Sequence, residues 1–232
     1  MNIYNTEDIK HFDKLHREWW DKEGPLKTLH SINPVRLKYI KNTCQIENSL
    51  ILDIGCGGGI LSYSLAKNKA KVVGIDPSKK LINIASKNTK KYSNNLRFLN
   101  ITLEEYNRRI NNKFDIITCM ELIEHVKNPS FFIKMLEPML KKNSYIFFST
   151  INRNTLSYLK AIFLGEYVLK IIPKGTHQFK NFIKPSELNK MLNKINCSLV
   201  SIQGFEYNPL NNKSNFCEDI SCNYLSCFKF NG

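Results

Sequence analysis

The sequence lacks several features that would decide the class of the protein at once. It has no run of about 18 apolar residues, the length that a membrane-spanning helix needs, and we see no signal peptide. Its seven cysteines are an odd number without C-x-x-C spacing, which argues against a disulfide framework and against a zinc site. Neither an internal repeat nor a long linker is visible. We therefore expect one domain in a reducing compartment, either soluble or peripheral to a membrane.

Acidic residues are scarce relative to basic ones. The chain has 20 Asp and Glu against 34 Lys and Arg, which gives a formal net charge of +14. Such an excess is typical of proteins that bind nucleic acid or an anionic membrane. Lys, Asn and Ile are abundant everywhere in the chain, however, and A/T-rich codons favour all three. The diffuse charge alone therefore does not select a partner.

Glycine is also scarce, but it is concentrated at one place. The apolar run at Leu50–Ile54 breaks into a cluster that includes Gly55, Gly57 and Gly59. This pattern predicts a buried parallel strand followed by a sharp turn, where a ligand can approach the backbone. Asp76 ends the next apolar run and is placed to accept two hydrogen bonds from a ribose diol.

The glycine spacing indicates which nucleotide is bound. The three glycines give G-x-G-x-G, whereas the dinucleotide fingerprint needs its last small residue at position 60, which is Ile60. This favours S-adenosylmethionine over NAD, because S-adenosylmethionine has no pyrophosphate for the loop to enclose. A mobile glycine loop without a ligand is the other interpretation, but it does not explain why strand, loop, strand and acid occur in this order.

The rest of the chain alternates between strand-like and helix-like segments. Strands are predicted at 50–54, 72–76, 96–99, 114–119 and 145–149, and helices at 6–20, 60–68, 79–91 and 129–141. This alternation predicts an α/β protein with a doubly wound, mostly parallel sheet. Its ligand crevice would lie beyond the carboxyl ends of the strands, which gathers Gly55, Asp76 and Met120 around one pocket.

The last third of the chain has a different pattern. Helices are predicted at about 155–172 and 185–195, separated by a basic connector. Two strands at about 199–205 and 220–230 are expected to form an antiparallel pair that closes the sheet.

Seven segments of the chain resemble the ubiquinone biosynthesis O-methyltransferases. They are Trp19-Trp20-Asp21 and the stretches 29–37, 52–59, 119–126, 149–154, 173–177 and 207–209. The resemblance implies the class I S-adenosylmethionine-dependent methyltransferase fold, with a Rossmann-like sheet of seven strands in a single domain of residues 1–232. Within this domain the sequence itself predicts an N-terminal helical segment to about residue 45 and an apolar-basic insert at about 155–184. Where this family has Pro-Gly-Gly before the fifth strand, the chain has Lys142-Asn143-Ser144, in which Asn can adopt a left-handed turn.

The resemblance implies methylation of a ring hydroxyl at two stages of ubiquinone synthesis, on a 2-polyprenyl-6-hydroxyphenol and on a demethylubiquinol. Cofactor contacts in such relatives fall at positions that match Arg36, Gly55, Asp76 and Met120. Arg36 would contact the cofactor's carboxylate, although a solvated arginine on an N-terminal helix is the alternative. Met120 would pack on the adenine ring, although it is also consistent with an ordinary core methionine.

Glu121, Glu124 and His125 are the candidates for the chemical step. A phenol with a pKa near 10 is protonated at neutral pH, so either a general base or a bound divalent ion must help it to ionise. The i, i+3, i+4 spacing predicts that all three side chains share one helix face, where they would suit Mg²⁺ or Zn²⁺. Two alternatives stay open, a metal-free base role for His125 and an acidic helix start that the helix dipole favours.

The substrate implied by the resemblance carries an apolar tail and must be met at a bilayer. Residues 161–172 are almost all apolar but too few to span a membrane, and they are flanked by Lys160, Lys174, Lys180 and Lys184. We expect this segment to dock on an anionic membrane surface, with the protein cytoplasmic and peripherally associated with the inner face of the membrane. Other enzymes of ubiquinone biosynthesis are further expected partners. A buried core helix with a solvated lysine loop is the alternative.

Three other functions compete with this interpretation. The basic charge permits an RNA methyltransferase, but we find no appended RNA-binding module and expect no nucleic-acid partner. A methyltransferase acting on another small molecule is the second. A non-catalytic cofactor-binding subunit is the third, although it would tolerate loss of Glu121, Glu124 and His125, and all three are present.

Overall fold

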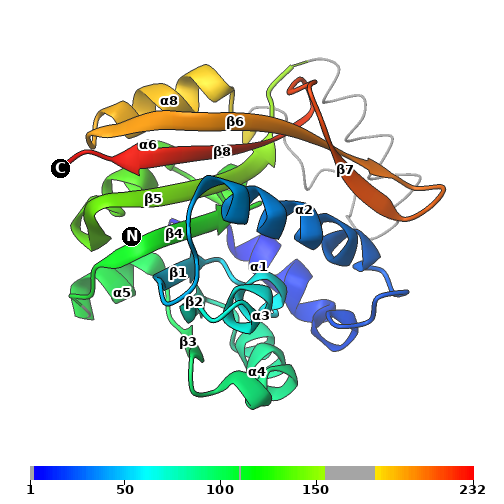
Figure 1. Ribbon diagram of the computed structural model, residues 1–232. Helices are drawn as coiled ribbons and strands as arrows, with labels where there is room; N and C mark the ends of the chain where they lie inside the picture. Colours follow the sequence, from blue (N-terminus) through cyan, green and yellow to red (C-terminus); the bar gives the residue numbers. More distant parts are fainter. Residues whose placement is uncertain (1–2, 110, 155–180) are drawn as a thin grey trace.

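The computed structural model describes residues 3–109, 111–154 and 181–232. One twisted sheet lies between two layers of helices, and its strands run in the order β3-β2-β1-β4-β5-β8-β6-β7 (Figure 1). The strands are β1 (Leu50–Ile54), β2 (Lys71–Asp76), β3 (Leu96–Asn100), β4 (Phe114–Met120), β5 (Leu140–Ile151), β6 (Cys197–Asn208), β7 (Lys213–Cys217) and β8 (Asn223–Phe230).

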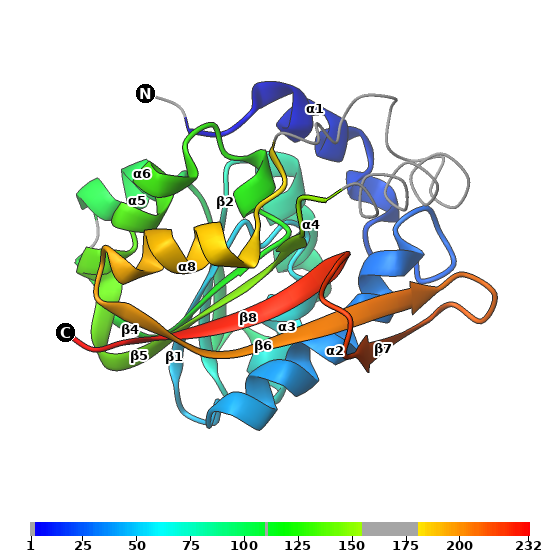
Figure 2. The same cartoon turned by 90° about the horizontal axis from the view of Figure 1, so that it is seen from above.

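Seven α-helices are described. They are α1 (Thr6–Lys14), α2 (Lys27–Thr43), α3 (Ile60–Lys67), α4 (Lys79–Asn88), α5 (Leu103–Arg109), α6 (Pro129–Lys134) and α8 (Pro185–Asn193). Short 3-10 turns lie at His16–Glu18, Lys90–Tyr92, Ile123–His125 and Glu137–Met139. The view from above shows α5, α6 and α8 on one face of the sheet and α2 and α3 on the other (Figure 2).

The sheet confirms the predicted doubly wound, mostly parallel topology. Strands β1 to β5 pair in parallel, and β8 runs antiparallel between β5 and β6. The predicted antiparallel pair near the C-terminus is therefore present as β6 and β8. The prediction of seven strands is wrong, because the described residues already form a sheet of eight. The additional strand, β7, pairs with the end of β6 from Gly204 to Asn208.

Successive side chains along each strand point to opposite faces of the sheet, so the apolar core has one part on each face. On β5, Ile146 and Phe148 pack toward α5, α6 and α8, whereas Phe147 between them packs toward α2 and α3. On β1, Leu52 and Ile51 divide in the same way. Both faces of each central strand are thus buried, which explains why these strands have continuous apolar sequences.

Local sequence signals set the starts of several helices. The Ser78 hydroxyl accepts a hydrogen bond from the Leu81 N–H and caps α4, and Asn128 caps α6 in the same way just before a proline. The predicted helix at 129–141 is too long, because α6 ends at Lys134 and β5 already begins at Leu140. Asn143 has a φ of 64°, which confirms the left-handed turn predicted there.

The segment from residue 3 to residue 20, which we call the N-terminal strap, crosses the carboxyl ends of the strands (Figure 1). Tyr4 forms an antiparallel bridge with Val126 after β4, and the Lys127 N–H donates to the Ile3 carbonyl. The single helix predicted at 6–20 is wrong, since α1 ends at Lys14 and a separate 3-10 turn follows. The strap therefore reaches the edge of the sheet where a ligand crevice is expected.

The predicted helix at 155–172, and with it most of the apolar-basic insert, lies outside the described residues. Within the described ranges, no helix is long and apolar enough to cross a membrane.

Candidate active site

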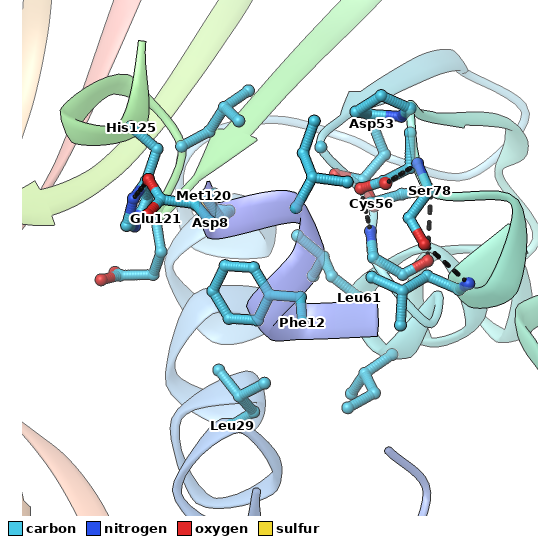
Figure 3. Close-up of a pocket in the computed structure, with 18 of the residues that line it drawn as sticks. Asp8, Phe12, Leu29, Asp53, Cys56, Leu61, Ser78, Met120, Glu121 and His125 are labelled. Carbon is cyan, nitrogen blue, oxygen red and sulfur yellow. Dashed lines mark hydrogen bonds and ion pairs between the residues drawn. The ribbon is translucent and has the colours of Figure 1, made fainter. Parts of the chain in front are cut away.

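A cavity opens at the carboxyl ends of β1, β2 and β4, under the N-terminal strap. Arg36, Gly55, Asp76, Met120, Glu121 and His125 all line it, so six of the seven residues predicted from the sequence come together. Figure 3 shows Asp53, Cys56 and Ser78 at one end of the cavity and Asp8, Glu121 and His125 at the other, with Met120 and Phe12 between them.

The glycine loop forms the floor of the cavity and is covered closely by the strap. Gly57 and Gly59 have φ values of 53° and 82°, a region that favours glycine. A Cβ on Gly57 would lie 2.6 Å from the ring of Trp19, so the indole can rest on the loop only because side chains are missing there. The Trp20 Nε1 donates to the Gly58 carbonyl at 2.9 Å. The tryptophan pair thus fixes the strap over the predicted cofactor loop.

Asp76 lies at the end of β2 with its carboxylate buried against the same loop. Its oxygens accept hydrogen bonds from the Gly57 N–H at 3.0 Å and the Ser78 N–H at 2.8 Å. Burial raises the pKa of Asp76 to about 6, and these two hydrogen bonds oppose the rise. Because each carboxylate oxygen has two lone pairs, Asp76 can still accept from a ribose diol while it holds the loop.

Arg36 places a buried positive charge in the cavity wall. It comes from α2 and is only 6% exposed, and its Nη2 lies 3.0 Å from Glu121 Oε1. Within the described part of the chain, its Nε has no hydrogen-bond partner. A buried guanidinium with an unused donor is costly unless a ligand completes it, and a carboxylate is the group that matches its geometry. Arg36 therefore fits the carboxylate of S-adenosylmethionine.

Glu121 follows β4 directly and has an unusual backbone. Its φ of 50° is uncommon for a residue with a side chain, and its N–H donates to the Ser149 carbonyl at 2.9 Å. The Ser149 hydroxyl in turn donates to the Glu121 carboxylate. The prediction that Glu121, Glu124 and His125 share one helix face is wrong, because only a 3-10 turn at Ile123–His125 is helical and Glu121 precedes it.

His125 lies at the opposite end of the cavity from Asp76 and pairs with the strap. Its Nδ1 is 2.8 Å from Asp8 Oδ2, and both side chains are largely buried. Burial alone would lower the pKa of His125, but the hydrogen bond to Asp8 and the charges of Glu124 and Glu121 outweigh it, so the pKa lies above the ordinary 6.5. Sequence reasoning missed Asp8 entirely, since nothing local marks an aspartate in the first turn of a helix as functional.

Glu124 is the predicted residue that the structure separates from the others. It is 3% exposed and does not line the cavity, and its Oε2 accepts from the Thr150 hydroxyl at 2.9 Å. Burial and the neighbouring Glu121 raise the pKa of its carboxyl group. In the described residues no group of three His, Cys, Asp or Glu side chains is arranged to hold a metal ion. The three residues as placed therefore do not fit the metal site that the sequence suggested.

Comparisons with known proteins identify the family. A family profile described as a methyltransferase domain matches residues 11–202. The ubiquinone biosynthesis O-methyltransferase of Coxiella burnetii (strain RSA 331 / Henzerling II) is 43% identical over 224 residues, which cover 97% of this chain and 95% of that protein. The chain belongs to the ubiquinone biosynthesis O-methyltransferase family. Its relative of the same name from Pasteurella multocida (strain Pm70) is 39% identical over 239 residues, with 99% of each protein covered.

Solved structures place this family member in a wider fold class. Magnesium protoporphyrin IX methyltransferase from Synechocystis PCC 6803, solved with bound SAH, superposes with a TM-score of 0.70 at 18% identity over 95% of this chain and 94% of that one. A methyltransferase from Thermotoga maritima gives 0.65 at 17% identity over 96% and 99%. These likenesses confirm the predicted methyltransferase fold.

Asp53 is a cavity residue of this family member that the sequence prediction did not single out. Asp53 is buried in β1, where the Thr118 and Ser62 hydroxyls donate to its carboxylate, and burial raises its pKa. It lines the cavity near Arg36, whose charge opposes that rise. His30, which lies in one of the segments that carry the resemblance, contacts the Trp19 carbonyl through Nε2 at 2.9 Å. His30 thus holds the strap rather than facing the cavity.

Proposed function

We propose that the protein transfers a methyl group from S-adenosylmethionine to a ring hydroxyl of polyprenylated phenol and catechol intermediates of ubiquinone biosynthesis, at both O-methylation steps. The observation that carries this proposal is the division of one cavity into two ends. Asp76 and the glycine loop suit a nucleoside, Arg36 suits a carboxylate, and His125 lies beyond them, where an acceptor hydroxyl would have to approach. The names of the curated relatives support the same reaction.

The residues of the cavity have two tasks, which are to place the acceptor oxygen next to the methyl group and to accept one proton. Bound S-adenosylmethionine supplies an activated methyl group. Holding the acceptor oxygen within about 3.5 Å of that methyl carbon, in line with the bond that breaks, provides much of the rate. His125 is the proposed proton acceptor, and Glu121 is proposed to orient Arg36, because its carboxylate is already engaged by Arg36 and Ser149. Met120 is proposed to pack against the adenine ring.

The direct test is methyl transfer with labelled cofactor. We expect the protein to methylate a tail-less catechol analogue of the substrate and to leave bulk RNA unlabelled. Labelled RNA with inactive catechol would overturn the proposal in favour of the RNA alternative. Labelling of unrelated phenols or amines at the same rate as the catechol would favour another small-molecule methyltransferase.

A divalent ion stays a separate hypothesis that this assay can also test. The sequence suggested Mg²⁺ or Zn²⁺ at Glu121, Glu124 and His125, but the carboxylate of Glu124 is turned toward Thr150. We therefore derive no step through a metal. Protein treated with a chelator should keep its activity, and a loss that added Mg²⁺ or Zn²⁺ restores would show that a rearranged metal site exists.

Cofactor affinity should depend on pH through Asp76. Its pKa of about 6 is that of the ligand-free protein, and the ionised carboxylate is the form that accepts two hydrogen bonds from a diol. Since protonation removes one acceptor, the Kd for SAH should rise as the pH falls below about 6, approaching tenfold per pH unit. Calorimetry between pH 7 and 5 measures this. The same titration with Asp76→Asn should be flat, and an equal slope in both proteins would assign the effect to another group.

We further propose that the protein meets its substrate at an anionic membrane surface through the segment 161–184. The support comes from the sequence, namely the apolar run 161–172 and the lysines around it, since residues 155–180 lie outside the described part of the chain. A lysine close to such a surface contributes about 1 kcal/mol. Association with other enzymes of the pathway is a prediction that rests on the family resemblance alone.

Charge reversal tests the membrane proposal. Replacing Lys174, Lys180 and Lys184 by Glu should remove most co-sedimentation with anionic liposomes and leave methylation of a tail-less catechol intact. The matched control reverses Lys71, Lys113 and Lys142, three exposed lysines at or near the amino ends of β2, β4 and β5, opposite the cavity. Equal liposome binding by both triple variants and the wild type, or no binding by wild type at low salt, would contradict the proposal. Segment 161–184 would then be a buried core helix with a solvated lysine loop.

A further inference from the structure

Asp8 contacts the active site from a distant part of the chain. Its side chain comes from the first turn of α1, is 12% exposed, and places Oδ2 2.8 Å from His125 Nδ1 after β4 (Figure 3). The neighbouring Glu7 has the opposite environment, because its side chain is 75% exposed and pairs with Lys10. Of these two adjacent carboxylates on one helix turn, Asp8 is buried against His125 and Glu7 faces solvent.

The contact with Asp8 determines which imidazole nitrogen of His125 carries the proton. An ionised carboxylate can only accept a hydrogen bond, so Nδ1 must be the donor toward Asp8. In the neutral ring the proton then lies on Nδ1, and Nε2 carries the lone pair. Phe12, one turn further along α1, packs edge-on against the same ring at 6.1 Å between centroids. The strap thus controls both the tautomer and the orientation of His125.

The strap has a second carboxylate contact that does not involve His125. Asp13, at the other end of α1, accepts a hydrogen bond from the Ser78 hydroxyl after β2. Asp8 and Asp13 therefore tie the same helix to two different strand ends, one beside His125 and one beside Asp76. The contact with Ser78 at the cofactor end is therefore separate from the contact with His125.

We propose that Asp8 is a positioning residue, which keeps the proton of the neutral His125 ring on Nδ1 so that Nε2 is the basic nitrogen. The proposal rests on the function proposed above. In the reaction, the acceptor O–H gives its proton to Nε2 and the oxygen forms a bond to the methyl carbon. The carbon–sulfur bond breaks with its electron pair going to sulfur, and the imidazolium later returns its proton to solvent. The base is therefore completed by two residues that are 117 positions apart in the sequence.

Four variants distinguish the positioning of His125 by Asp8 from the attachment of the strap to Ser78 by Asp13. Asp8→Ala and Asp8→Asn should lower kcat by about 10- to 100-fold and leave KM for S-adenosylmethionine and Kd for SAH nearly unchanged, because tautomer and orientation are lost but the cofactor end is intact. Asp13→Asn should show the reverse, a weaker cofactor affinity with kcat largely kept. Glu7→Gln removes a charge from the same helix turn and should match the wild type.

Proton NMR tests the role of Asp8 without measuring enzyme activity. The Nδ1 proton of His125 should give a slowly exchanging downfield resonance in the proton NMR spectrum of the full-length protein, absent in His125→Gln and Asp8→Ala and kept in Glu7→Gln. A resonance that survives Asp8→Ala, or Asp8 variants that lose SAH affinity as Asp13→Asn does while keeping kcat, would overturn the proposal. Wild-type protein that methylates no catechol would instead refute the proposed function, with the resonance still deciding the role of Asp8.

Discussion

His125→Ala should lower kcat for a tail-less catechol by about 10² to 10⁴-fold, the usual contribution of a positioned general base. The acceptor hydroxyl is protonated at neutral pH, and His125 is the imidazole at the acceptor end of the cavity. Its pKa above 6.5 makes it a stronger base than an ordinary histidine, so the acid limb of kcat/KM in the wild type should also lie above 6.5. SAH affinity should be nearly unchanged, since Asp76 and the glycine loop lie at the other end.

The ionisation state of the acceptor distinguishes a base from a packing residue. An acceptor that is already ionised at the assay pH, such as a nitrocatechol, does not need a proton acceptor. The penalty of His125→Ala should therefore shrink strongly with this acceptor. Loss of activity by the same factor with both acceptors would mean that His125 shapes the cavity and that the proton goes elsewhere.

The cofactor end of the site was predictable because its information is local. Leu50–Ile54, Gly57 and Asp76 belong to one strand-loop-strand unit, in which alternation, glycine and the position of an acid each have a direct physical meaning. The pairing of β1 with β2 then brings the acid to the loop without help from the rest of the chain.

The acceptor end was only partly predictable, because residues far apart in sequence build it. Asp8 and His125 are in contact although 117 positions separate them, and Arg36 contacts Glu121 from α2. The spacing of Glu121, Glu124 and His125 suggested one helix face, but β4 extends to Met120 and Glu121 takes a positive φ before the 3-10 turn begins at Ile123. Periodicity assumes a regular element, so it fails where a turn intervenes.

Two predictions of helix and strand boundaries were wrong for reasons that particular residues explain. The helix predicted at 129–141 ends at Lys134, four residues before Pro138, whose ring has no N–H to donate to the Lys134 carbonyl and would clash with it in a continuous helix. Strand β7 has a largely polar sequence and no apolar alternation, so the period of two that marks a half-buried strand is absent. It folds back on the end of β6 as the next strand in the chain, on the edge of β6 that faces away from β8.

Asp76→Ala should weaken SAH binding by about 2 to 3 kcal/mol, or roughly 30- to 150-fold in Kd. The carboxylate is buried and fixed by the Gly57 and Ser78 N–H groups, so its remaining lone pairs are already aimed when the ribose arrives. Alanine removes both acceptors for the diol and also leaves two backbone donors of the loop without their partner. The loss should therefore appear in cofactor affinity first and in kcat only at subsaturating S-adenosylmethionine.

Calorimetry with SAH at pH 7.5 measures this effect, with Glu47→Ala as the control of equal charge change. Glu47 pairs with Lys69 at the surface, at the amino ends of β1 and β2, and its removal should leave Kd unchanged. Asp76→Asn should recover little, because the amide must turn its NH₂ group toward one of the two backbone N–H donors and leave that donor unpaired in a buried site. Wild-type affinity in Asp76→Ala would mean that the ribose is held elsewhere in the cavity and that Asp76 serves only to fold the glycine loop.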